Sequence, residues 1–72
     1  MIQAKQTVWR GDARCDMCKK IITRTLYDAA TRHGPWATMC ASCFSYYGLG
    51  VGTGKGQQYK QQPDGLFVKI AG

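Results

Sequence analysis

The 72-residue chain contains no glutamate: its four acidic residues are all aspartates, against ten lysines and arginines. It also lacks an apolar run near the roughly 18 residues that a membrane-spanning helix needs. Residues 1–10 have neither the long apolar segment nor the small-residue cleavage site of a secretory signal. We therefore expect an intracellular, cytoplasmic protein that does not associate with a membrane.

The chain also lacks the residue sets that most enzymes use. There is one histidine, His33, and its nearest carboxylate in the sequence is Asp28, five residues away across an expected turn. General-base catalysis needs an orienting partner within hydrogen-bond reach. No nucleophile is paired with a base, so we expect neither an enzyme nor a small-molecule substrate.

Cysteine is scarce, but all four residues fall into two Cys-x-x-Cys pairs: Cys15 with Cys18, and Cys40 with Cys43. A spacer of roughly 15–20 residues between such pairs is typical of zinc sites, and the spacer from Lys19 to Met39 is one residue longer. Disulfides would need an oxidising compartment, and a thioredoxin-like site would need a βαβ unit that this chain is too short to hold. The spacing predicts one structural Zn²⁺ bound by four thiolates.

A structural zinc ion also suits the size and charge of the chain. A domain this small buries only about 60% of its unfolded surface, whereas a structural zinc site supplies about 10–16 kcal/mol of binding energy. The formal charge of +6 falls to about +4 once four thiolates and one Zn²⁺ are counted. The remaining positive charge suits a phosphate-rich partner, but it also suits plain solubility.

The pattern along residues 1–72 predicts a single small α+β zinc-bound domain with a zinc core over 15–47 and a frayed start over 1–7. Residues 21–27 alternate as a strand, 28–35 turn, and 36–39 return as a second strand. Residues 40–47 form a short helix that Gly48 caps. The Gly/Gln-rich segment 48–62 begins with the glycine tract 48–57, which is either extended, with one face bare, or a mobile loop.

Residues 66–70 read as a final strand. In that strand we expect Leu66, Val68 and Ile70 to pack on the hairpin, while Phe67 and Lys69 face outward or cover Trp9.

This order of a Cys-x-x-Cys knuckle, a hairpin and a second Cys-x-x-Cys that opens a helix resembles the treble-clef class of zinc fingers. The alternative is a zinc ribbon, in which both pairs lie on hairpins. Nucleases of the treble-clef class carry a His-Asn-His or similar set on the hairpin and helix, but Thr23, Arg24, Thr25, Ser45 and Tyr46 stand on those elements here. The catalytic set is absent, so the resemblance does not imply nuclease activity.

A narrower resemblance covers most of the chain. Residues 36–43, the glycine tract 48–57 and the ending 64–70 are similar to small, mostly uncharacterised zinc proteins encoded by bacteriophages and prophages. This resemblance implies a location in a phage-infected bacterial host, but no activity.

Two binding functions remain. For nucleic acid, DNA or RNA, we expect phosphate contacts from Arg10, Arg14, Lys19, Lys20, Arg24 and Lys55. Base stacking would then come from Trp9, Trp36, Tyr46 or Tyr47. The alternative is a protein-protein interaction module, which would act on host machinery if the phage resemblance holds, and which presents the same four aromatic residues to a protein partner. We favour nucleic acid because the chain is basic and lacks glutamate.

Overall fold

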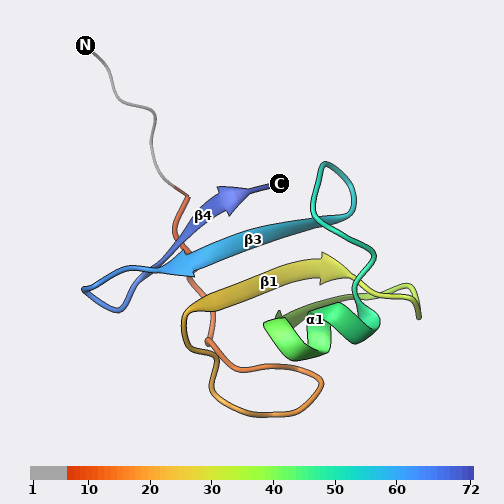
Figure 1. Ribbon diagram of the computed structural model, residues 1–72, viewed down its shortest axis with the longest axis horizontal. Helices are drawn as coiled ribbons and strands as arrows, with labels where there is room; N and C mark the ends of the chain where they lie inside the picture. The colour runs from red at the N-terminus through yellow and green to blue at the C-terminus, as the bar shows by residue number, and fades with distance from the viewer. Residues whose placement is uncertain (1–6) are drawn as a thin grey trace.

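The computed structural model describes residues 7–72 as a four-stranded antiparallel sheet with one short helix (Figure 1). The strands are β1 (Thr25–Ala30), β2 (Trp36–Cys40), β3 (Gly56–Gln61) and β4 (Phe67–Ala71), and the helix α1 (Ala41–Tyr47) follows β2 directly. Their order in the sheet is β2-β1-β3-β4. The small α+β class expected from the sequence is confirmed.

Both faces of the sheet contribute to the core. Leu26 and Tyr59 are paired across β1 and β3, so their side chains share one face, where Trp9 lies edge-on to Tyr59 with ring centroids 5.5 Å apart. On the other face, Tyr27 stacks on Phe44 of α1 with ring centroids 3.9 Å apart. The helix packs against β1 and β2, and β3 and β4 lie beyond it (Figure 1).

The N-terminal segment extends the sheet at its β4 edge. Trp9 N–H donates to the Phe67 carbonyl at 2.9 Å, and Lys69 N–H donates to the Thr7 carbonyl at 2.8 Å. The frayed start expected over residues 1–7 otherwise lies outside the described residues. No helix within residues 7–72 is long and apolar enough to cross a membrane.

The first strand starts later than the sequence pattern predicts. The expected strand over 21–27 is wrong at its beginning, because Arg24 has a left-handed backbone with φ of 69° that a strand does not accommodate. Ile21 instead pairs with Arg14 in the small ribbon that carries the first cysteine pair. The strand then continues through Ala30, where a turn was expected.

The interior of the glycine tract is not extended. Gly50, Gly52 and Gly54 all have positive φ, and two hydrogen bonds between Gly52 and Gly56, of 2.9 and 3.0 Å, close a tight loop. The expected bare face is therefore wrong over this loop. The chain then enters β3, a central strand for which the sequence pattern provided no prediction. Gly48 does end α1, donating its N–H to the Phe44 carbonyl at 2.9 Å.

The last strand, β4, begins one residue later than the expected strand over 66–70, and the prediction of its packing holds in part. Val68 is buried as expected, but Phe67 is buried too, whereas Leu66 and Ile70 are more than half exposed. The strand pairs with β3 and not with the β1–β2 hairpin, and a bulge between Gln58 and Tyr59 shifts the register. This bulge and the choice of partner decide which side of β4 faces the core.

A substitution at Gly56, the first residue of β3, tests how closely the backbone there packs against β1 and the glycine loop. A Cβ at Gly56 would lie 2.6 Å from both the Ala29 Cβ and the Gly50 carbonyl oxygen. Gly56→Ala is therefore expected to lower the free energy of unfolding by about 1–3 kcal/mol, measured by thermal or urea unfolding. Gly54→Asn is the control, because Asn tolerates the left-handed backbone and a Cβ there meets nothing within 4 Å. Equal stability of the two variants would contradict the close packing at Gly56.

Candidate metal centre

The first cysteine pair lies on a tight turn at the tip of a small ribbon. Cys15 N–H donates to the Lys20 carbonyl and Lys19 N–H donates to the Cys15 carbonyl, both at 2.9 Å. Cys18 N–H points at the Cys15 sulfur at 3.5 Å. The turn requires a left-handed backbone at Lys19, with φ of 68°. This geometry directs the sulfurs of Cys15 and Cys18 toward one side.

The second pair is delivered by the junction of β2 and α1. Cys40 is the last residue of β2, opposite Leu26 of β1, and Cys43 lies in the first turn of α1. Cys40 also immediately precedes the helix, in an extended conformation. A strand and a helix thus each position one of the two sulfurs.

The four sulfurs meet. All four Sγ atoms lie within 4.8 Å of one another, and those of Cys18 and Cys40 are 3.9 Å apart. A tetrahedral site with Zn–S bonds of about 2.3 Å places its sulfurs about 3.8 Å apart, whereas a disulfide needs about 2.05 Å. All four cysteines are free thiols. The group is able to hold one metal ion.

The surroundings of the sulfurs favour charge on some of them and oppose it on others. Burial raises the pKa of Cys15, but backbone N–H groups of Cys18, Cys40 and Met17 outweigh it and lower the pKa to about 6. Burial, together with the neighbouring sulfurs, raises the pKa of Cys43 to about 12. Four sulfurs this close cannot all be ionised unless a cation lies among them. The donor set therefore fits a divalent metal ion.

Asp16 fastens the first knuckle to the edge of the sheet. Its backbone N–H donates to the Thr38 carbonyl at 2.8 Å, and its Oδ2 accepts from the Thr38 N–H at 2.9 Å. Thr38 is central in β2, the edge strand next to β1. Both of its outward backbone groups are thus paired, so the knuckle covers part of an otherwise open edge.

Two groups of the sheet, the half-buried Asp28 and the buried Tyr59, are held more strongly in their protonated forms than usual. Burial, and then the charge of Asp16, raises the pKa of Asp28 in the middle of β1. Burial, and then the charge of Asp28, raises the pKa of Tyr59, whose hydroxyl donates to Gln57 Oε1 at 2.9 Å. Both groups lie within the sheet, while His33 is exposed in the β1–β2 turn.

The six cations selected from the sequence are distributed over the surface. Arg14 has a local contact, because its Nη1 donates to the Lys19 carbonyl at 2.9 Å. Arg24 and Lys55 lie at opposite ends of β1: Arg24 precedes the strand, and the Lys55 carbonyl accepts from Ala30 N–H at its end. Six strand residues span about 20 Å, so Lys55 is not part of the group around Arg24.

The four selected aromatic residues divide into two pairs. Trp9 and Tyr47 are half-buried: Trp9 lies on Tyr59, and the ring of Tyr47 lies 6.0 Å from those of both His33 and Tyr46. Trp36 is 47% exposed and Tyr46 is 74% exposed. Of the four, Trp36 and Tyr46 are therefore the more accessible to a partner.

Sequence reasoning missed the role of Asp16 and did not single out Lys60, an exposed cation. Asp16 stands between the first two cysteines, where the sequence does not show that β2 will lie beside it. Lys60 lies in β3, and its position opposite Thr25 depends on a strand pairing that the polar run of glutamines does not reveal. Finding the position of Lys60 would have required a prediction of which strand β3 pairs with and in which register.

No protein-family model, curated protein or solved structure matches this chain. Its function is therefore inferred from its own residues.

Asp16 provides a test of how the knuckle is held. Asp16→Ala removes the side-chain acceptor of Thr38 N–H and is expected to cost about 1 kcal/mol of unfolding free energy. The same change is expected to speed metal loss to a competing chelator, because the knuckle carries two of the sulfurs. Asp12→Ala is the matched control, since only its backbone carbonyl is used, by Trp9 Nε1. Identical metal-release rates for both variants would show that this contact does not support the site.

Proposed function

We propose that this chain is a non-enzymatic, zinc-stabilised domain that binds nucleic acid. Thiolates are soft ligands, and four of them in a tetrahedral arrangement are typical of structural zinc. Cys15, Cys18, Cys40 and Cys43 would fill all four positions and leave none for water or substrate. In this proposal the metal holds the fold, and a separate surface carries the function.

The arrangement of the cysteines supports the treble-clef alternative over the zinc ribbon. The first pair lies on a knuckle, a β-hairpin follows, and the second pair spans the junction into α1. A ribbon would place both pairs on hairpins, whereas Cys43 is a helical residue. Neither arrangement by itself specifies a partner.

The observation that carries the proposal is an exposed excess of positive charge. Within residues 7–72, exposed lysines and arginines occur in the N-terminal segment, at the start of β1 and on β3, and the chain has only four acidic residues. Arg10, Lys19 and Lys20 lie on either side of the first cysteine pair. Phosphate contacts of this kind supply most of the affinity for nucleic acid without requiring a base sequence.

A protein-interaction module is the second candidate. It is favoured by the exposure of Trp36 and Tyr46, together with that of Leu49, which is 56% exposed in the loop after α1. Large exposed aromatic residues often anchor protein interfaces. In that case binding would change little with salt, because the anchors are apolar.

One experiment on the knuckle tests whether its cations contact nucleic acid, as the first candidate requires. Lys19→Ala/Lys20→Ala is expected to leave the fold intact, because both side chains are exposed, and to weaken binding to duplex or single-stranded oligonucleotides. The slope of log K against log salt should fall by about 0.7–0.9 for each phosphate that the variant no longer neutralises. Arg32→Ala/Lys69→Ala carries the same net charge and serves as the control. Equal affinities for the wild type and the knuckle variant would remove Lys19 and Lys20 from the interface.

A further inference from the structure

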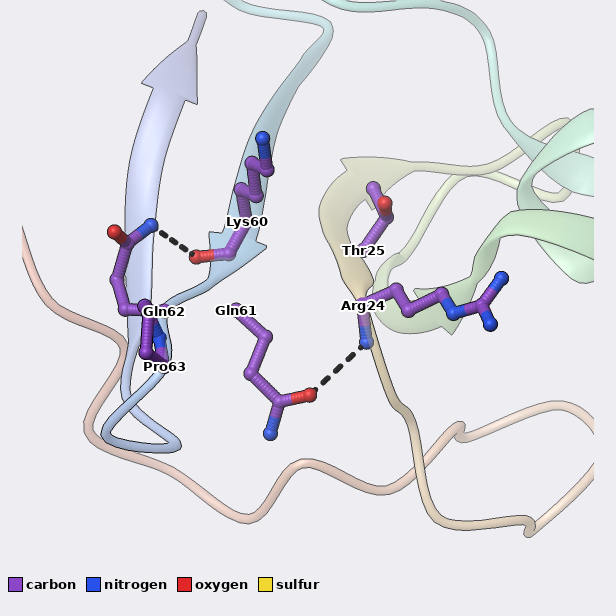
Figure 2. Close-up of a pocket in the computed structure, with 6 residues that line it drawn as sticks. All are labelled: Arg24, Thr25, Lys60, Gln61, Gln62 and Pro63. Atoms are coloured by element: carbon purple, nitrogen blue, oxygen red, sulfur yellow. Dashed lines mark hydrogen bonds between the residues drawn. The ribbon is translucent and has the colours of Figure 1, made fainter.

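A groove lies at the end of the sheet where β1 begins and β3 ends (Figure 2). It has a volume of about 580 Å³. Two cations and three polar side chains line it, and no acidic side chain does; the lining residues are Arg24, Thr25, Lys60, Gln61, Gln62 and Pro63. An anionic ligand is the complement of such a lining.

The strand register explains why these groups meet. Thr25 is directly opposite Lys60 in the β1–β3 pair, so their side chains share one face of the sheet. This is the face on which Tyr27 stacks against α1, but the helix packs on β1 and β2 and leaves the β3 side beyond it. Figure 2 shows Thr25 and Lys60 pointing the same way, with Gln61 directed to the opposite side.

Both cations of the groove are free to bind a ligand. Among residues 7–72, the Arg24 guanidinium and the Lys60 ammonium have no hydrogen-bond partner: the bonds at these residues come from Arg24 N–H and the Lys60 carbonyl. The Thr25 hydroxyl likewise makes no side-chain hydrogen bond within the described chain. Gln62, in contrast, already donates its Nε2 to the Lys60 carbonyl at 3.1 Å.

The backbone at Arg24 adds an independent observation. Its φ of 69° is a conformation that is unfavourable for a residue with a Cβ and that glycine adopts freely. Gln61 holds it there: its N–H donates to the Arg24 carbonyl at 2.8 Å, and its Oε1 accepts from Arg24 N–H at 3.2 Å. Strained residues that the surrounding structure fixes in place cluster at binding sites.

We propose that this groove binds the phosphodiester backbone of a single-stranded nucleic acid. Lys60 and Arg24 contact different phosphates, because their charged ends extend in different directions from the groove (Figure 2), and the Thr25 hydroxyl donates between them. This inference deepens the proposed function and rests on it. It also adds Lys60, Thr25 and the conformation of Arg24 to the binding surface.

The composition of α1 favours a single strand over a duplex. Reading base edges in the major groove of a duplex takes an element with side chains such as Arg, Lys, Asn or Gln. The helix Ala41–Tyr47 contains none of them, and its Phe44 is occupied by Tyr27. A flexible single strand can follow a basic groove through its phosphates alone, and Arg24 and Lys60 supply the cations for such contacts.

The test compares two variants of equal net charge. Arg24→Gln/Lys60→Gln removes the two groove cations, and Arg32→Gln/Lys69→Gln removes two cations elsewhere. Arg32 lies in the turn beyond the far end of β1, and Lys69 shares the Tyr59 face of the sheet. Zinc-loaded proteins are titrated with an oligothymidylate, a duplex of the same length and inorganic phosphate, with amide chemical shifts as the readout.

We expect the groove variant to bind the oligothymidylate several-fold more weakly than the control variant. The slope of log K against log salt for the groove variant should also be shallower by about 0.7 for each phosphate that the variant no longer neutralises. In the wild type, the largest shifts should fall at Thr25, Gln61 and Gln62. Tighter binding of the duplex than of the single strand would overturn the single-strand assignment.

The failures are distinguishable. If the wild type binds neither nucleic acid, the proposed function falls and the groove assignment with it. If it binds the oligothymidylate and both variants bind equally well, the proposed function stands and the groove is not its site. If inorganic phosphate produces the same shifts at the same concentration, the groove is a free-phosphate site and the nucleic-acid assignment is overturned.

Arg24→Gly gives a second, independent readout. Glycine relieves the left-handed backbone, so the variant should unfold at a higher temperature than the wild type while binding the oligothymidylate more weakly. A variant that is more stable and binds normally would show that neither the guanidinium nor the strained backbone of Arg24 takes part in binding. Loss of binding together with loss of stability would assign Arg24 a structural role instead.

Discussion

The convergence of four sulfurs beside the edge of β2 is the constraint on which the rest of this small structure depends. It joins three parts of the chain: the N-terminal ribbon with Cys15 and Cys18, the end of β2 and the start of α1. The two hydrogen bonds between Asp16 and Thr38 keep the ribbon in register with the sheet. A cation among the sulfurs removes the repulsion between thiolates that otherwise opposes this arrangement.

The position of the first cysteine pair also determines where one side of the groove between β1 and β3 lies. The chain leaves the knuckle through Ile22, whose side chain is buried in the core, and Arg24 follows two residues later at the start of β1. From there, β1 pairs with β3, and Thr25 comes to lie opposite Lys60. The fold of the knuckle therefore positions one wall of the groove, although none of the four cysteines lines it.

Sequence patterns predicted the parts of this fold that depend on local chemistry. The cysteine spacing identified all four members of the cluster, and the uninterrupted run after Cys40 identified α1. Features set by tertiary context were not predictable in the same way. The polar residues Gln57 and Gln58 show no apolar alternation, yet their strand lies between β1 and β4, and the left-handed backbone at Arg24 falls at an arginine rather than a glycine. Of the groove, the sequence therefore indicated only Arg24.

A cobalt titration of the metal-free chain tests the central claim most directly, because tetrahedral thiolate coordination of Co²⁺ absorbs visible light while amide spectra report folding. We predict that both signals saturate together at one equivalent, and that Cys40→Ser reaches neither the wild-type absorption nor a dispersed amide spectrum. A dispersed, native-like amide spectrum before any metal is added would contradict the claim that the four-cysteine site organises this fold.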